Sequence, residues 1–330
     1  ASPAGACSMV QQLFYYESHS HSPYYNLALE DVLRSQLLPG EAVLYLWRND
    51  HTVVIGKHQN AYHECDLEAI RADGVSLARR KTGGGAVFHD AGNLNFTFLN
   101  CREDYDPERN FKILLEALKA VGVPAVLSGR NDLTVEGLKF SGNAFFKSAR
   151  AAYHHGTLMV EVSMEKLARY LRVSPLKLRS KAVASVCSRV VNLCRICPAL
   201  TLEALAQSLR NSFAASYGLP LLPGPAPDED RRAGAEKSFA SPAWILGEKP
   251  NAAPSSVNIE ERFDWGCVLI SGKGSERSLY SDALDTEAVE YLRLRLALDS
   301  PGQIPVPDSF TSFQKKMVED INKLLKKFTE

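Results

Sequence analysis

Three consecutive glycines, Gly83 to Gly85, constrain this chain more than any other feature of its sequence. Strand-like segments stand on both sides of them. Without side chains, their backbone N–H groups can approach a ligand closely and can point the same way, which is how proteins build a nest for an anion. Arg79, Arg80 and Lys81 come just before them. The sequence therefore predicts a site for a phosphate or a carboxylate, with a merely flexible glycine turn as the alternative.

The glycines do not form either of the common nucleotide-binding loops. A Walker A loop needs Gly-Lys-Ser/Thr after its glycines, and a dinucleotide fingerprint needs G-x-G-x-x-G between a strand and a helix. Neither pattern is present at this position. The predicted anion site is therefore of another type.

Strand and helix patterns alternate through the first part of the chain. The spacing of apolar residues predicts helices over Tyr24–Leu37 and Phe111–Val121, and strands over Val43–Trp47, Thr52–Ile55 and Asn93–Phe98. The last of these strands alternates fully, with leucine and phenylalanine on one face and asparagine and threonine on the other. Helices and strands in this order predict an α/β (α+β) fold with mixed sheets flanked by helices.

A hairpin is predicted over Asp132–Phe140, with a Glu-Gly dipeptide as its turn. Lys139 then points to the opposite face from its two apolar neighbours, so its side chain is rigidly aimed. An edge lysine that discourages strand pairing is the alternative. Asp132 suits Mg²⁺, which prefers one or two carboxylates together with substrate phosphates. With Asn131, it can equally well cap a turn.

Charge and composition argue against several other classes of protein. Lys and Arg total 38, and Asp and Glu also total 38, so no net field draws the chain to nucleic acid or to an anionic membrane. No apolar run approaches the roughly 20 residues that span a bilayer. Seven scattered cysteines, with a CxxC at 194–197 that has no further zinc ligands nearby, are typical of reduced structural thiols. We expect a soluble, cytoplasmic protein.

Shifts in composition divide the chain. The expected divisions are a remnant of an expression vector over residues 1–8, a catalytic domain over 9–250 and a small α+β accessory domain over 251–330. Residues 220–227 are rich in proline and 228–237 are charged, which predicts a surface excursion or a linker. Near the C-terminus, one apolar stripe predicts the buried face of a helix; it contains Phe313, Met317, Ile321, Leu324, Leu325 and Phe328.

Several runs of sequence together resemble the lipoate–protein ligase A family of the bacterial type. They are RRKTGGGAVFHDAGNLNFTF (79–98), GRNDL (129–133), KFSGNA (139–144), YHHGTL (153–158), LWRNDHTVVIG (46–56) and HQN (58–60). AWILG (243–247) and ERFDWG (261–266) resemble, more weakly, the family's join to its C-terminal accessory domain. The resemblance extends from about Met9 to the end of the chain. It implies a catalytic domain like that of the biotin and lipoate ligases.

The resemblance also implies a two-step reaction. Lipoate or octanoate attacks the α-phosphate of ATP to give an acyl-adenylate and pyrophosphate, and a lysine of an acceptor protein then displaces AMP. The implied acceptors are the lipoyl domains of 2-oxoacid dehydrogenase complexes and the H protein of glycine cleavage. The implied metal is Mg²⁺. The protein is expected to be a monomer that binds neither nucleic acid nor membrane.

Roles for individual residues follow from the same resemblance. Lys139 would be catalytic, because it would bridge the acyl carbonyl and the α-phosphate and stabilise the charge that develops there. Asp132 would hold Mg²⁺. The residues that would bind ATP and lipoyl-AMP are Arg80, Gly83, Gly84, Gly85, Ala86, Val87, Phe88, Asn131, Asp132, Lys139 and Lys181. Trp47, Val54 and His89 would line the slot for the acyl chain.

One segment departs from the family pattern. SKAVASVCSRVVNL (180–193) resembles the family's adenylate-binding loop, but Ala182 replaces a glycine and Cys187 replaces an arginine. An arginine fork suits phosphate, whereas a thiol is a single weak donor. We therefore expect activation by ATP to be weakened more than transfer from a preformed adenylate. Lys181 and Arg189 are candidates to compensate.

Other functions compete with this interpretation. An ATP-independent lipoyl or octanoyl transferase of the same fold would need a cysteine nucleophile, and only Cys187 lies near a motif. A lipoyl-adenylate-binding protein without activity would follow if the altered loop has lost its chemistry. A biotin ligase is disfavoured, because its arginine–glycine phosphate loop is missing. We interpret His89, His154 and His155 as structural or adjacent to substrate, since no Ser or Cys nucleophile accompanies them.

Overall fold

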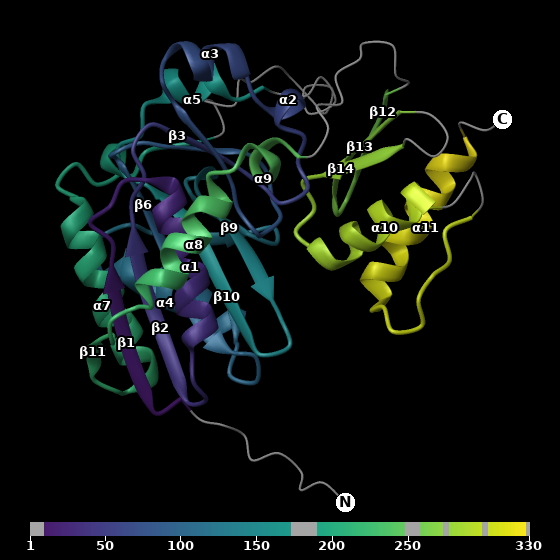
Figure 1. Ribbon diagram of the computed structural model, residues 1–330. Helices are drawn as coiled ribbons and strands as arrows, with labels where there is room; N and C mark the ends of the chain where they lie inside the picture. The colour runs from purple at the N-terminus through teal and green to yellow at the C-terminus, as the bar shows by residue number, and fades with distance from the viewer. Residues whose placement is uncertain (1–9, 173–189, 248–257, 273–276, 299–302, 328–330) are drawn as a thin grey trace, which may run out of the picture.

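The computed structural model describes residues 10–172, 190–247, 258–272, 277–298 and 303–327. The described residues up to 247 form a large body, and those from 258 onward form a small body (Figure 1). The predicted mixed α/β architecture is confirmed. None of the described helices is long and apolar enough to cross a membrane.

An eight-stranded mixed sheet forms the centre of the large body, with the strand order β11-β1-β2-β6-β10-β9-β8-β7. Strands β11, β1 and β2 run parallel to one another, and the other neighbouring pairs are antiparallel. The strands are β1 (Gln12–Glu17), β2 (Glu41–Trp47), β6 (Asn93–Cys101), β7 (Val126–Ser128), β8 (Asp132–Val135), β9 (Leu138–Lys147), β10 (Ala151–Met159) and β11 (Leu221–Pro223).

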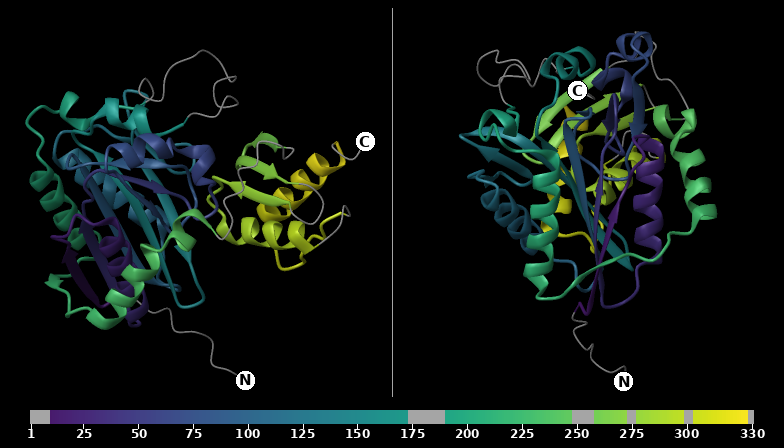
Figure 2. Two further views of the ribbon diagram at one scale, coloured as in Figure 1. Left: turned by 45° about the horizontal axis from the view of Figure 1, so that its top comes forward. Right: turned by 90° about the vertical axis from the view of Figure 1, so that its left-hand side faces the viewer.

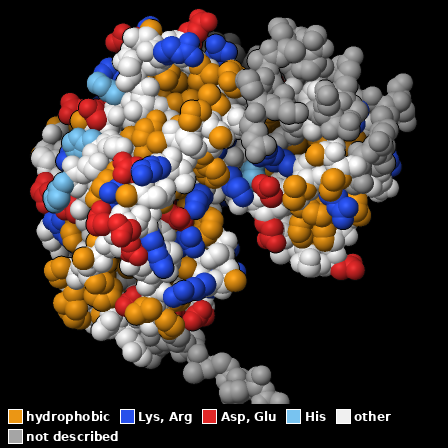
Figure 3. Space-filling model, viewed as in Figure 1, with side chains coloured by type: hydrophobic (Ala, Val, Ile, Leu, Met, Phe, Trp, Pro, Cys, Tyr) orange, Lys and Arg blue, Asp and Glu red, His pale blue; other side chains and the backbone are white. Residues whose placement is uncertain are grey.

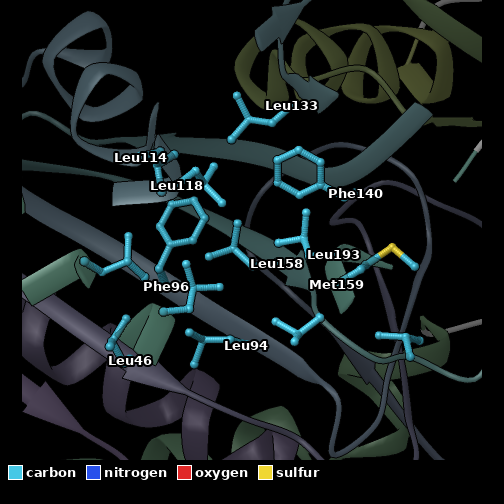
Figure 4. Packing of buried hydrophobic residues seen from close by; sticks show 14 of the residues in the cluster. Leu46, Leu94, Phe96, Leu114, Leu118, Leu133, Phe140, Leu158, Met159 and Leu193 are labelled. Atoms are coloured by element: carbon cyan, nitrogen blue, oxygen red, sulfur yellow. The ribbon is translucent and has the colours of Figure 1, made fainter. Parts of the chain in front are cut away.

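The two faces of this sheet bury two different apolar clusters. Along β2, Leu44 and Leu46 belong to the cluster that also contains residues of α4 and α7, and Figure 4 shows side chains of this cluster. Val43 and Tyr45 alternate with them and pack with residues of α1 on the other face, beside α8 (Figure 2). The helices are α1 (Pro23–Gln36), α2 (Ala61–Glu64), α3 (Leu67–Ala72), α4 (Pro107–Ala120), α5 (Met164–Tyr170), η2 (Leu193–Arg195), α7 (Leu202–Tyr217), α8 (Glu229–Phe239) and α9 (Pro242–Leu246).

A second, three-stranded sheet carries the glycines. Its order is β4-β3-β5, with β3 (Thr52–Ile55) parallel to β4 (Ser76–Arg79) and antiparallel to β5 (Val87–His89). The glycine loop, residues 80–86, connects the two outer strands across the end of β3. The loop is therefore anchored at both ends by strands of the same sheet.

The predicted hairpin is confirmed as β8 and β9. Glu136 has φ +53° and Gly137 has φ +77°. Two successive residues with positive φ are what a type I′ turn requires, and this turn matches the twist of the paired strands. The hairpin fixes Lys139 on the second residue of β9.

Of the two alternatives expected for residues 220–237, a surface excursion or a linker, the linker is wrong. β11 (Leu221–Pro223) pairs in parallel with β1 at the edge of the sheet, and α8 packs beside α1. Asp228 caps α8 by accepting from the N–H of Arg231. Proline can occupy an edge strand, and a charged helix can cover a surface, so composition alone did not separate these elements from a linker.

The small body is a three-stranded antiparallel sheet covered by two helices. Its elements are β12 (Asn258–Phe263), β13 (Gly266–Ser271), β14 (Ser278–Ser281), α10 (Thr286–Leu298) and α11 (Ser312–Lys326). Met317, Ile321 and Leu324 of the predicted stripe are buried in its own apolar cluster, whereas Phe313 is 41% exposed and Phe328 lies outside the described residues. The expected boundary near residue 250 also falls outside the described residues, so the division at that position stays a prediction.

Candidate functional site

A cavity of about 110 Å³ lies between the two sheets of the large body. The small sheet and the glycine loop form one wall, and strands β2, β6, β9 and β10 of the large sheet form the other, with one residue from α1. The lining residues are Leu27, Trp47, Val54, Arg80, Gly84, Gly85, Ala86, Val87, His89, Asn95, Asn131, Lys139, Gly142, Asn143, Ala144, His155, Gly156 and Thr157.

Arg80 organises the glycine loop from inside. Its Nη2 donates to the carbonyl oxygens of Gly83 and Gly85, each at 2.8 Å, and its Nε donates to Thr82 Oγ1 at 3.1 Å. Its Nη1 donates to the carbonyl of Val54 at 3.2 Å. Burial lowers the pKa of this guanidinium to about 10, so it still carries its charge at neutral pH.

The neighbouring cations do not face the cavity. Arg79 donates to the backbone carbonyls of Gly56, Lys57 and Gln59 and to those of residues 244 and 245, which ties the end of β4 to α9. Lys81 pairs with Asp31 at 2.9 Å. Of the three successive cations that the sequence offered, Arg80 is therefore the one that lines the cavity.

The three glycines differ in how much room the fold leaves for a side chain. A Cβ on residue 83 would lie 2.1 Å from the carbonyl oxygen of Ala283 in the small body. Gly84 has a backbone φ of +90°, which residues with a side chain rarely adopt. A Cβ on Gly85 would meet no atom of the described residues within 4 Å. Only this last position opens into free space beside the cavity.

The hairpin brings a cation and an anion to the rim of the cavity. Lys139 Nζ lies 2.8 Å from Asp132 Oδ1, and the two side chains are 39% and 35% exposed. Asn131 is held in place because its Nδ2 donates to the carbonyl of Asn143 and its own carbonyl accepts from Asn143. A Cβ on Gly142 would come within 3.2 Å of Nζ, so a glycine there leaves room for the ammonium.

A buried network joins Trp47, on one side of the cavity, to the glycine loop. Trp47 Nε1 donates to Thr97 Oγ1 at 3.1 Å, and that hydroxyl donates to Glu30 Oε1 at 2.7 Å. The same carboxylate oxygen lies 2.9 Å from His155 Nδ1, and His155 Nε2 lies 2.8 Å from Thr82 Oγ1. Because Thr82 also accepts from Arg80, one chain of hydrogen bonds connects Trp47 with Arg80.

The remaining histidines differ in their surroundings. His154 lies among Phe96, Phe98, Phe111 and Phe145, and burial lowers its pKa to about 3. His89 lines the cavity, and burial, with the nearby Arg80 and His155 adding to it, lowers its pKa to about 3. Neither histidine takes up a proton near neutral pH. None of the cysteines that the structure describes lines the cavity.

The sequence-predicted residues fall into three groups. Those that line the cavity are Arg80, Gly84, Gly85, Ala86, Val87, Asn131, Lys139, Trp47, Val54 and His89. Gly83 faces the small body, Phe88 packs against Tyr170 in the core, and Asp132 stands beside Lys139 without lining the cavity. Lys181, Ala182, Cys187 and Arg189 lie outside the described residues.

Sequence reasoning missed Glu30 and Thr82 of the buried network and the cavity-lining residues Asn95, Gly156 and Thr157. A usable signal existed for Asn95, since it belongs to the polar face of a strand whose residues are all buried. A buried polar face needs partners or a ligand. No comparable signal marked Glu30, which lies within an ordinary helical pattern.

The described residues contain no group of three or more His, Cys, Asp or Glu side chains arranged to hold a metal ion. Asp132 is a single carboxylate at the rim, partly exposed and paired with Lys139. One carboxylate together with phosphate oxygens is an ordinary donor set for Mg²⁺. The residues present therefore fit a Mg²⁺ ion that arrives with a nucleotide, and they do not form a metal cage of their own.

Comparisons with known proteins agree with this geometry. Residues 22–214 match the family model described as the lipoyl protein ligase A/B catalytic domain. Lipoate-protein ligase A of Psychrobacter cryohalolentis is 40% identical over 291 residues, which are 84% of this chain and 85% of that protein. The chain therefore belongs to the lipoate–protein ligase A family and is an enzyme of that ligase class.

Solved structures show the same relationship. P. falciparum LipL1 in complex with lipoate is 26% identical with a TM-score of 0.76, and the match covers 96% of this chain and 99% of that one. A lipoate-protein ligase A bound with ATP is 24% identical with a TM-score of 0.61 over 72% of this chain and 99% of that one. The second match is a likeness of fold.

Proposed function

We propose that this ligase joins lipoate to a lysine of an acceptor protein through lipoyl-AMP. In the first step a carboxylate oxygen of lipoate attacks the α-phosphorus of ATP, and pyrophosphate leaves. In the second step the neutral ε-amine of the acceptor lysine attacks the acyl carbonyl carbon, AMP leaves with the bonding electrons, and the nitrogen loses a proton. The observation that supports this proposal is the convergence of Lys139, the glycine loop and an apolar slot on one cavity.

Lys139 is the proposed catalytic residue. Both steps build negative charge on oxygens of the α-phosphate and the acyl carbonyl, and a preorganised ammonium stabilises such charge more in the transition state than in the ground state. The ammonium already pairs with a carboxylate oxygen of Asp132. When substrate binds, one of its oxygens would replace the Asp132 oxygen, so the Lys139 ammonium would stay paired with an anion during both steps.

The glycine loop is the proposed cradle of the adenylate. Gly84, Gly85, Ala86, Val87 and Asn131 would contact the nucleotide and the acyl head. Arg80 would act chiefly by holding the loop carbonyls, because its donors are already occupied there. Gly83 and Phe88 would contribute through their backbone alone. Lys181 is proposed from the sequence.

The proposed slot for the acyl chain is lined by Trp47, Val54 and His89, with Leu27 and Val87 added by the structure. Apolar side chains on both walls suit a carbon chain, since burying apolar surface is favourable by about 25 cal/mol per Å². The slot and Lys139 belong to the same cavity. A chain in the slot can therefore present its carboxylate to the ammonium.

Asp132 is the proposed ligand of Mg²⁺. When bound with ATP, the ion would neutralise phosphate charge and so favour departure of pyrophosphate. Asp132 could contact the ion and the Lys139 ammonium at the same time, because a carboxylate has two oxygens and several lone-pair sites.

The proposed acceptors are lipoyl domains of 2-oxoacid dehydrogenase complexes and the H protein of glycine cleavage, and the proposed setting is the cytoplasm, where the protein acts as a monomer. Residues 9–250 are the proposed catalytic domain and 251–330 the proposed accessory domain. The strong motifs and the described cavity-lining residues all belong to the first of these.

Release of pyrophosphate with lipoate, octanoate or biotin tests the function, and Lys139→Met tests the residue. Methionine keeps most of the volume of the lysine stem but removes the ammonium. We expect about a 10²-fold or larger loss of pyrophosphate release, the scale for removing one preorganised charge contact. Lys147→Met, on the same strand but outside the cavity, is the matched control and should retain full activity.

The same assay separates the competing functions. Acyl transfer between proteins without ATP would identify a transferase, and tight binding of lipoyl-AMP without release of pyrophosphate or transfer would identify a binding protein. Near wild-type release by Lys139→Met would remove that residue from the mechanism.

A further inference from the structure

Lys139 lies on the part of β9 that precedes its pairing with β10. That pairing covers residues 143–147, and at Lys139 the partner is Thr134 of β8. A second neighbour of Lys139 is Val190, with which it forms an isolated parallel bridge. The N–H of Val191 donates to the carbonyl of Lys139 at 2.9 Å. This short segment therefore supplies a second backbone partner for the strand residue that carries the ammonium.

The side chain of Asn192 fixes the segment in place. Its Nδ2 donates to the carbonyl of Val162 at 2.8 Å, and its Oδ1 accepts from the N–H of the same residue at 3.0 Å. A backbone carbonyl only accepts and a backbone N–H only donates, so these two contacts also settle the orientation of the amide. Asn192 is 9% exposed and Val162 is 3% exposed. One side chain thus makes both hydrogen bonds of a backbone pair, away from water.

The neighbours of Asn192 are buried in the main apolar cluster of the large body. Val191 belongs to this cluster, and so does Leu193, which is buried together with Phe140, the residue after Lys139 (Figure 4). Asn192 itself is not among the described residues that line the cavity. Its connection to the site therefore runs through the backbone, from Val162 to the segment and from Val191 to Lys139.

The aim of the Lys139 ammonium depends on this backbone. A catalytic group must be held to within about 0.5 Å of its working position by the residues that support it. The Lys139 side chain is 39% exposed, and its printed ion pair is with Asp132. Under the proposed function a substrate oxygen takes the place of that Asp132 oxygen. During the reaction the position of the ammonium then rests on the strand from which the side chain extends.

We propose that Asn192 is a positioning residue for Lys139. Its amide clamps the segment to Val162, and the clamped Val191 N–H holds the Lys139 carbonyl, so that the ammonium points to the reacting oxygens. The inference rests on the proposed function, because it requires Lys139 to be the catalytic charge. It assigns to Asn192 no contact with substrate.

A double-mutant cycle on release of pyrophosphate tests the proposal, with lipoate and ATP both saturating. Asn192→Asp keeps the side-chain volume and one oxygen for the Val162 N–H, but it sets a second oxygen against the Val162 carbonyl. We expect the saturated rate to fall about tenfold and KM to change less than about threefold, since a misplacement of about 1 Å can cost about 10²-fold in rate. In Lys139→Met there is no ammonium to position, so the same substitution should slow release less than about twofold.

A second variant and a matched control separate positioning from a general effect on the fold. Val191→Pro removes the N–H that donates to Lys139 and leaves the Asn192 amide intact, and it should give the same slowing with the same dependence on Lys139. In the small body, Asn322 clamps Ile304 in the same way, with both contacts at 2.8 Å. Asn322→Asp should change the rate by one factor whether residue 139 is lysine or methionine. Thermal unfolding gives the folded fraction of each variant, and rates are compared per folded molecule.

The outcomes distinguish this inference from the function on which it rests. Equal slowing by Asn192→Asp with and without the lysine, or a wild-type rate in Asn192→Asp or Val191→Pro, would overturn the positioning role and leave the ligase function standing. A wild-type rate in Lys139→Met would remove the catalytic charge and this inference with it. Failure of the wild-type protein to release pyrophosphate would overturn the proposed function itself.

Discussion

Adding one methyl group to the glycine loop should affect stability and binding in opposite directions. In Gly85→Ala the new Cβ meets no atom of the described residues within 4 Å, and the residue does not have a positive φ. Alanine at a compatible position stabilises by about 0.4–1 kcal/mol, because it restricts the unfolded chain. For a body of this size, that corresponds to a rise in Tm of about 1–4 °C.

Binding should weaken because the same methyl group occupies space that we assign to the adenylate. Overpacking a close contact costs about 1–3 kcal/mol, which is about a 5- to 150-fold loss of affinity. Thermal unfolding without ligand and calorimetry with lipoate and a non-hydrolysable ATP analogue measure the two effects separately. Gly84→Ala is the matched control, since its φ of +90° predicts loss of stability and binding together.

Two results with Gly85→Ala would contradict our interpretation of this residue. A Gly85→Ala protein with raised Tm and unchanged affinity for both ligands would show that nothing approaches the backbone at this residue. The glycine would then serve only to connect β4 to β5. A lowered Tm without ligand would instead show that our account of the space around residue 85 is wrong.

Three further predictions address the rest of the chain. A protein that ends near Pro254 should still transfer lipoyl from supplied lipoyl-AMP but activate lipoate poorly; loss of transfer by a folded truncation would show that the boundary is misplaced. Cys187→Arg should speed formation of lipoyl-AMP about ten- to a hundred-fold, the worth of one charge-assisted hydrogen bond, and change transfer much less; equal effects on both steps in single-turnover measurements would contradict this. Three buried histidines, His58, His89 and His154, have pKa values lowered to about 3 in the folded protein. Because they take up protons near pH 6.5 only in the unfolded chain, the free energy of unfolding should fall as the pH drops below about 6.5. Between pH 7 and pH 5.5 each histidine should lower it by about 1.2 kcal/mol, measured by urea unfolding, and a flat profile would contradict this.

The sequence predicted those elements whose formation depends mainly on residues close together in the chain. The hairpin around Glu136 and Gly137 could be located because a glycine follows one strand pattern directly and precedes the next, although glutamate is not a residue that favours its positive φ of 53°. The alternation along β6 could be read because side chains of a strand point to opposite faces. The segment over 220–237 was misjudged, since its strand is short and edge-bound and its helix owes its place to α1 rather than to its own apolar face.

The sequence could not show where the side chains of Arg79 and Arg80 point, for a different reason. Arg79 and Arg80 are adjacent in sequence, yet one donates to carbonyls near α9 and the other to the glycine loop. Arg79 is the last residue of β4, where it pairs in register with Ile55, and the chain turns away from the strand directly after it. Which cation lines the cavity is thus set by where a strand ends, a boundary that sequence patterns locate only to within a few residues.

The Glu30 network shows why part of the site has no sequence signature at all. Its members come from α1, β6, β10 and the glycine loop, and each looks ordinary in its own segment. Assembled, they connect Trp47 in the cavity wall to Arg80 beneath the loop through hydrogen bonds between buried groups, where an unmade bond costs more than in water. We therefore expect a shift of the Trp47 ring to be passed along these hydrogen bonds to Thr82, which accepts from Arg80 Nε. Under the proposed function, the fit of the acyl chain would then bear on the geometry of the glycine loop.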